Sequence, residues 1–282
     1  MPAEAGALVI SLDFELHWGV RDVRPVAAYR DNLLGVRAAV PALLRLFAEF
    51  EVHATWATVG FLCCEDKREL LDALPSRRPA YVRPELSPYG ALGEVGEGER
   101  DDPFHFAPSL VRLIAEAPHQ EIGTHTLSHY YCLEPGQSPE DFRADLSAAL
   151  RLMRRKLGRV PRSIVFPRNQ VAAPYVQVCG EAGLVAYRGN RDAWAYRSRA
   201  YAEESPVRRA VRLADAYLPL TGPGARQPRA AAPGEPVDVT ASRYLRPYAP
   251  SLRRLERLRL HRITADLRRA ARNGAVFHLW WH

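Results

Sequence analysis

Short apolar segments with the character of β-strands alternate along this chain with segments of helical periodicity, and this alternation limits the possible folds more than any other feature. Strands are expected over residues 8–15, 52–59, 162–169, 184–190 and 274–282, and a further strand is expected to end near Thr124. Strands that alternate with helices form a largely parallel sheet or barrel. At 282 residues, the chain has a length that α/β barrels often use for one domain. We therefore predict an α/β fold in a single domain, 1–282.

The expected helices lie between these strands, over residues 30–50, 108–117, 138–158, 174–182 and 251–272. The third has the clearest signals, because Ser138 and Asp141 have the spacing of a capping box and Gly158 follows the last turn. Two stretches, 75–105 and 221–250, are expected to be loop-rich insertions. In folds of this class the active residues lie at the C-terminal ends of the strands.

Composition limits the partners of the chain. A hydrophobic content of 47% and a charged content of 25% are ordinary for a soluble globular protein. No apolar run reaches membrane-spanning length, so no transmembrane segment is expected. The net charge of +7 comes almost wholly from arginine, and no basic run is interleaved with aromatic residues as in a nucleic-acid-binding surface. We expect no nucleic-acid partner, whereas an anionic small substrate is compatible with the charge.

The cysteines indicate a reducing environment. None of the four forms a CxxC pair: Cys63, Cys64, Cys132 and Cys179. Adjacent or scattered thiols are typical of proteins without a disulfide framework. The N-terminus also lacks a basic segment followed by a long apolar one. We therefore expect a cytoplasmic protein.

The first strand ends in alternating polar residues. Asp13, Glu15 and His17 occupy every second position, so an extended strand would place them on one face. Burying two carboxylates side by side is costly unless a partner compensates their charge. Two interpretations remain open at this point: these carboxylates serve a functional site, or they cap neighbouring helices.

Two histidine pairs have a spacing of four residues. His125 and His129 follow the strand that ends near Thr124, and they can bind one metal ion together with a carboxylate if the chain turns helically there. Surface or helix-capping histidines are the alternative interpretation. His278 and His282 lie on an expected strand, where four residues span about 13 Å, so this pair is not expected to share an ion.

The remaining candidates are an arginine and several tryptophans. Arg168 follows "IVF" near the end of an expected strand, and an arginine in such a place serves either a site or a structural ion pair. Trp194, Trp280 and Trp281 have the same ambiguity, because aromatic rings pack cores and also stack on sugar rings beside a cavity.

Four motifs together resemble a known family. "SLDFE", "THTLSH", "FPRN" and "FHLWWH", in this order, are similar to motifs of the polysaccharide deacetylases, carbohydrate esterase family 4. The similarity is greatest to the branch with an Asp-x-Glu or Asp-x-Asp first motif, which includes proteins of O-antigen and surface-polysaccharide biosynthesis. It runs from about residue 7 to the end. The resemblance implies a distorted (β/α) barrel and metal-dependent removal of an N-acetyl, or occasionally an O-acetyl, group from a sugar.

The resemblance also implies roles for individual residues. Asp13 matches the general base, and Arg168 matches the arginine that steadies this base. The implied metal ligands are Glu15, His125 and His129. His282 matches the histidine that protonates the leaving amine, with His278 as the weaker candidate. The residues expected to contact substrate are Trp194, Trp280 and His278.

The implied cofactor is a divalent metal ion, with zinc expected and cobalt, nickel and iron left open. The implied substrate is an acetamido sugar, and its linkage to a nucleotide or a lipid phosphate stays open, as does the oligomeric state. Two other functions remain alternatives. One is a catalytically silent barrel that binds carbohydrate, and the other is a C–N hydrolase for another amide, such as a formamido sugar or a ureide.

Overall fold

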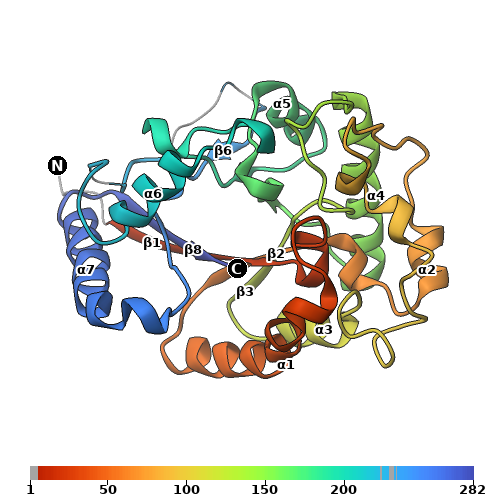
Figure 1. The fold of residues 1–282 in the computed structure, drawn as a ribbon, viewed down its shortest axis with the longest axis horizontal. Coiled ribbons are helices and arrows are strands. Elements are labelled where there is room, and N and C mark those ends of the chain that lie inside the picture. The colour runs from red at the N-terminus through yellow and green to blue at the C-terminus, as the bar shows by residue number, and fades with distance from the viewer. Residues whose placement is uncertain (1–5, 223, 229–231, 233) are drawn as a thin grey trace.

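A single parallel sheet curls through the centre of the molecule, and helices cover its outer side (Figure 1). The computed structural model describes residues 6–222, 224–228, 232 and 234–282. The strands follow the order β6-β5-β4-β3-β2-β1-β8-β7, and every neighbouring pair is parallel. Their bounds are β1 Ala7–Phe14, β2 Ala54–Thr58, β3 Gln120–Thr124, β4 Ser163–Ile164, β5 Ala186–Tyr187, β6 Val237–Asp238, β7 Arg243–Tyr244 and β8 Val276–Trp281. The predicted single-domain α/β fold of the distorted-barrel type is confirmed.

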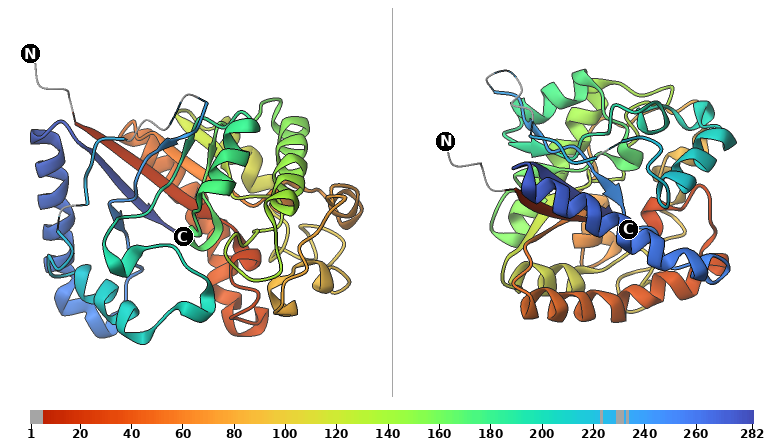
Figure 2. Two further views of the ribbon diagram at one scale, coloured as in Figure 1. Left: turned by 90° about the horizontal axis from the view of Figure 1, so that it is seen from above. Right: turned by 90° about the vertical axis from the view of Figure 1, so that its left-hand side faces the viewer.

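Seven α-helices surround the sheet over the described residues, and Figure 2 shows α7 and α1 on its outside. Their bounds are α1 Val26–Glu49, α2 Lys67–Asp72, α3 Pro108–Glu116, α4 Pro139–Leu157, α5 Ala173–Glu181, α6 Pro206–Asp215 and α7 Glu256–Arg272. Short 3₁₀ helices join them: η1 Leu16–Gly19, η2 Gly60–Cys63, η3 Pro84–Leu86, η4 Tyr89–Ala91, η5 Pro167–Asn169, η6 Trp194–Tyr196, η7 Tyr201–Glu203 and η8 Pro250–Leu255. None of these helices is long and apolar enough to cross a bilayer.

One continuous segment joins the two edges of the curled sheet. In its first half, the Val239 N–H donates to the carbonyl of Tyr187 on β5. In its second half, the Ser242 N–H donates to the carbonyl of His278 on β8. Residues 237–245 therefore bridge the two edges of the curled sheet. Because every neighbouring pair of strands is parallel, the C-terminal ends of the strands point to one rim.

Several predicted elements differ in extent from the observed ones. The expected strand 162–169 is extended only at β4, because Arg168 and Asn169 both take a φ of 53° and turn the chain out of the sheet. Helix α6 was not expected from the sequence. Its start nevertheless has a signal, because Ser205 caps the Arg208 N–H just before Pro206, as Ser138 does at α4.

The two stretches expected to be loop-rich contain little regular structure. Residues 75–105, all of which are described, have η3 and η4 but no α-helix or named strand. The stretch 221–250 contains β6 and β7 and the start of η8, and residues 223, 229–231 and 233 within it lie outside the described residues.

Strand β1 lies at the centre of the sheet, between β2 and β8, and carries the alternation noted in the sequence. Phe14 turns into the apolar core against Trp56, whereas Asp13 and Glu15 are buried on the inner side. The expectation that His17 shares their face is wrong. Leu16 has a φ of 47°, which ends the strand, and the His17 ring contacts His105 and the Arg24 carbonyl instead.

Candidate active site

The polar side chains that follow β1, β3 and β8 meet at the C-terminal rim of the sheet. Glu15 Oε2 lies 3.0 Å from His129 Nε2 and 3.3 Å from His125 Nε2. The three possible ligand atoms all lie within 4.8 Å of one another, and all three residues are buried. One carboxylate and two imidazoles at this spacing can hold a divalent ion and leave coordination positions free for water and substrate.

The His125 ring is oriented as a metal ligand. Its Nδ1–H donates to the Val165 carbonyl at 2.7 Å, which leaves the lone pair on Nε2. That Nε2 atom is enclosed and, within the described residues, accepts no hydrogen bond. A buried nitrogen without a partner is uncommon, and a carbonyl that fixes the far ring nitrogen is the usual support of a metal-ligating histidine. The donor set therefore fits a metal ion.

The charge states of the other two ligands also fit. Burial lowers the pKa of His129 to about 4, so its imidazole is neutral near pH 7, the form that binds metals. Burial opposes the charged form of Glu15, but the adjacent His282 and the hydrogen bonds from histidines hold the pKa of Glu15 well below its usual range. Glu15 is therefore anionic at neutral pH, the form in which a carboxylate can bind a metal ion.

A bent loop rather than a helical turn brings the two histidines together. Thr126 and His129 both have positive φ, 65° and 60°, so the helical turn expected from their spacing is absent. Two supports from outside the ligand set hold this strained path. The Thr126 hydroxyl accepts the Tyr130 N–H at 2.8 Å, and the buried Asp145 carboxylate of α4 accepts the Leu127 N–H at 2.7 Å.

Asp145 should make stability depend on pH in one direction. Burial raises the pKa of Asp145 above its usual value to about 6, so its charged form is penalised in the folded state. This penalty is present above the folded pKa and is relieved as pH falls through it. As pH falls from 7 to about 5, the free energy of unfolding of wild type should therefore rise by about 1 kcal/mol relative to that of Asp145→Asn.

Urea denaturation of both proteins across this pH range measures the effect. Glu140→Gln, an exposed position on the same helix, is the control and should track wild type. A constant difference between wild type and Asp145→Asn across this range would contradict the prediction.

Asp13 is held by an arginine that the sequence analysis did not select. Arg188 Nη1 and Nη2 donate to the two Asp13 oxygens at 2.7 and 2.8 Å, and both side chains are buried. Arg188 also donates to Asn169 Oδ1 at 3.0 Å and stacks 4.0 Å from the centre of the Trp280 ring. Burial opposes ionisation of Asp13, but the Arg188 charge lowers the pKa of Asp13 below its usual value. Asp13 is thus an oriented carboxylate.

Arg168, the arginine predicted to steady Asp13, lies elsewhere. Its Nη2 donates to Asp22 Oδ2 at 2.5 Å, and its guanidinium stacks 4.4 Å from the Tyr131 ring centre. The positive φ at Arg168 turns its side chain to this position. The placement predicted for Arg168 is therefore corrected to Arg188, which also follows a strand end and had the same signal in the sequence.

Removing Arg188 should destabilise the fold through Asp13. Arg188→Gln leaves a buried carboxylate without its cation, and breaking such a pair costs about 3–5 kcal/mol. In an Asp13→Asn background the same change should cost much less, because no buried charge is left. Chemical denaturation of wild type, both single variants and the double variant measures this coupling. Equal costs in both backgrounds would show that Arg188 does not act through Asp13.

His278 of β8 and His282, which follows this strand, differ in how far a substrate can reach them. His282 Nδ1 donates to Glu15 Oε1 at 2.9 Å, and half of its side chain is exposed. Although burial opposes its charged form, Glu15 and Asp13 raise the pKa of His282 to about 9, so the ring is protonated at neutral pH. His278 is enclosed between Ser11 Oγ at 2.8 Å and the Val239 carbonyl at 2.9 Å. Neither ring nitrogen of His278 is free for a substrate.

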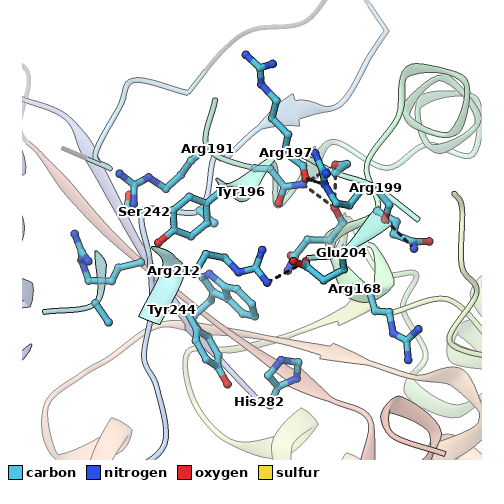
Figure 3. A pocket seen from close by; sticks show the side chains of 18 of the residues that line it. Arg168, Arg191, Tyr196, Arg197, Arg199, Glu204, Arg212, Ser242, Tyr244 and His282 are labelled. Atoms are coloured by element: carbon cyan, nitrogen blue, oxygen red, sulfur yellow. Dashed lines mark hydrogen bonds and ion pairs between the residues drawn. The ribbon is translucent and has the colours of Figure 1, made fainter. Parts of the chain in front are cut away.

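A cavity of about 350 Å³ adjoins the site through His282 (Figure 3). Trp280 lines it, as expected for a substrate-contacting residue, and so does Arg168. Trp194 is about half exposed, lies 4.6 Å from the Arg208 guanidinium and is not among the lining residues. Trp281 packs on Phe47 of the core. The expected contact of Trp194 with substrate therefore has no support from its position.

This chain is similar to several solved structures. Among solved structures, a protein from Mycobacterium smegmatis described as a polysaccharide deacetylase superposes with a TM-score of 0.58 and 16% identity over 100% of this chain and 78% of that one. A family 4 carbohydrate esterase from Streptomyces lividans in complex with acetate has a TM-score of 0.36 and 14% sequence identity, and the match covers 65% of this chain and 62% of that one. A pseudoenzyme of the same family from Bacillus anthracis has a TM-score of 0.37 and 12% sequence identity, and the match covers 65% of this chain and 43% of that one.

No protein with curated annotation matches this chain. The model of the family "Polysaccharide deacetylase", however, matches residues 28–187, which include His125 and His129. Because this match spans more than half of the sequence, the chain belongs to the polysaccharide deacetylase family.

Proposed function

We propose that this protein is a metal-dependent hydrolase that removes the N-acetyl group from an amino sugar. The observation that carries the proposal is the buried cluster of Glu15, His125 and His129, in which His125 Nε2 has no hydrogen-bond partner among the described residues. A second buried carboxylate, Asp13, is not a member of this cluster and approaches it through His282, which lies 3.8 Å from Asp13 Oδ2 and 2.9 Å from Glu15 Oε1.

Glu15, His125 and His129 would hold the ion, and zinc is the expected metal, with cobalt, nickel and iron as alternatives. When bound, such an ion polarises the amide carbonyl and makes water more acidic. The donor set of one carboxylate and two imidazoles is one that zinc commonly binds, and this supports zinc as the expected metal.

Asp13 acts as the general base. It is ionised, and the two hydrogen bonds from Arg188 fix its carboxylate plane, so it can take the proton of the attacking water. Its Oδ2 lies 3.8 Å from His282 Nδ1, which supports a base and an acid that act on the same bound amide. Arg188 is a positioning residue, because it acts through Asp13.

His282 acts as the general acid. Its ring is protonated at neutral pH and half exposed, so it can reach the nitrogen of a bound amide. An amine is a poor leaving group unless it is protonated, and this is the proton that His282 supplies.

The acetamido sugar belongs to surface-polysaccharide or glycolipid biosynthesis and is met in the cytoplasm. This part of the proposal rests on the resemblance of "SLDFE" to the Asp-x-Glu motif of that branch and on the four cysteines, which are all free and buried.

Release of acetate from a panel of acetamido sugars tests the function. The protein is stripped with a chelator, reloaded with Zn²⁺, Co²⁺, Ni²⁺ or Fe²⁺, and assayed in each state. Acetate release that requires the metal is expected. Release of formate from formamido sugars in its place would favour the other amide hydrolase. A protein that binds no metal and hydrolyses nothing, yet binds sugars, would be the silent barrel.

A further inference from the structure

The cavity beside His282 has an unusual charge. Of the described residues that line it, seven are arginines and one, Glu204, is a carboxylate. Figure 3 shows Arg212 and Glu204 in the middle of this cavity and Tyr244 and His282 towards one end. A cavity for a neutral sugar has no need of such an excess of cations.

Four of these arginines are compensated by ion pairs. The pairs within the described residues are Arg168–Asp22, Arg191–Asp215, Arg212–Glu204 and Arg243–Asp266. Even among these, Arg168 Nη1 and Arg243 Nε are enclosed and donate no hydrogen bond within the described part of the chain. Donor capacity is therefore left over after the internal pairs have formed.

Among the described residues, three lining arginines form no ion pair: Arg197, which is exposed, and Arg199 and Arg246, which lie deeper. Arg199 is half-buried and donates only to main-chain carbonyls, at 3.4 Å. Arg246 is also half-buried, and its guanidinium stands 5.9 Å from the Tyr244 ring centre. Holding uncompensated charge in a partly enclosed cavity is unfavourable, so the lining is suited to an anion of two or more negative charges.

The cavity also offers surfaces for a sugar ring. Tyr196, Tyr201, Tyr244 and Trp280 line it, and Trp280 stacks on Arg188, which holds Asp13. His282 contacts Glu15 on one side and lines the cavity on the other. A ligand with its amide at the candidate metal site therefore extends into the arginine-lined space.

We propose that this cavity binds a phosphoryl or diphosphoryl group attached to the acetamido sugar, so that the substrate is a sugar phosphate or its ester and not a neutral polymer. This inference rests on the proposed function in one respect, namely that the amide of the substrate binds at the candidate metal site. Guanidinium groups recognise phosphate oxygens bidentately, and a phosphoryl or diphosphoryl group matches the surplus charge better than a single carboxylate does.

The affinity of the metal-free protein for phosphorylated and neutral sugars tests the proposal. Without the metal ion, no substrate is turned over and phosphate cannot bind to the ion. Isothermal titration calorimetry is done with N-acetylglucosamine, its 1-phosphate, its uridine diphosphate ester, inorganic pyrophosphate and glucuronate. The phosphorylated sugars should bind at least about tenfold more tightly than N-acetylglucosamine. Equal binding of neutral and phosphorylated sugars, or tighter binding of glucuronate, would overturn the proposal.

The variants Arg199→Gln and Arg246→Gln locate the site. Their combination should weaken pyrophosphate binding about tenfold or more and reduce its dependence on salt. Arg253→Gln, an exposed arginine of η8 outside the cavity, should change it less than twofold. An equal loss in Arg253→Gln, or no loss in the double variant, would contradict the assignment. Deacetylation without any preference for phosphate would remove this inference and leave the proposed function standing.

Discussion

Replacing Asp13 by Asn is expected to reduce amide hydrolysis by about 10²–10⁴-fold while the protein keeps its metal. An amide cannot accept the proton of the attacking water, whereas the ligand cluster of Glu15, His125 and His129 does not include position 13. Asn still offers one oxygen to Arg188, so the local structure should be retained. The measurements are kcat for acetate release and the metal content of the purified, metal-replete variant.

Asp31→Asn is the matched control for this substitution. Asp31 is exposed on α1 and is not a member of the candidate site, so its variant should have the turnover of wild type. Normal turnover in metal-replete Asp13→Asn would remove Asp13 as the base. Loss of the metal together with turnover would place Asp13 among the ligands instead.

Much of the candidate site could be predicted because its residues lie at the end of a strand or follow one. In a parallel sheet all C-terminal ends meet at one rim, so the positions of Asp13, His125 and His282 followed from the order of strands and helices. The alternation of β1 also placed Phe14 correctly in the core, opposite Asp13. These inferences need only local periodicity and the fold class.

The parts that could not be predicted depend on single backbone torsions. Arg168 and Arg188 both follow strand ends, and the sequence does not distinguish them. The positive φ of Arg168 turns it to Asp22, which leaves Arg188 to pair with Asp13. Positive φ at Leu16 likewise removes His17 from the site. Such conformations are unfavourable for residues other than Gly and arise only where tertiary contacts enforce them.

Replacing His129 by Ala is expected to abolish both metal binding and turnover. His129 Nε2 is the ring nitrogen nearer to Glu15 Oε2, at 3.0 Å, and its removal leaves one imidazole and one carboxylate. Two protein ligands hold a divalent ion much more weakly than three, and we expect the affinity to fall by more than about 100-fold. Metal analysis after dialysis and the metal-induced rise in Tm both report this without an activity assay.

The rise in Tm separates the loss of a ligand from a general loss of stability. A metal present at about 100 times its Kd stabilises the folded state by about 2.7 kcal/mol, so wild type should show a large rise on addition of the ion. His129→Ala should show almost none, even if its Tm without metal is unchanged. His261→Ala, at an exposed position on α7, should behave as wild type. One tightly held equivalent of metal in His129→Ala would show that the ion, where it binds, is not held by the Glu15 cluster.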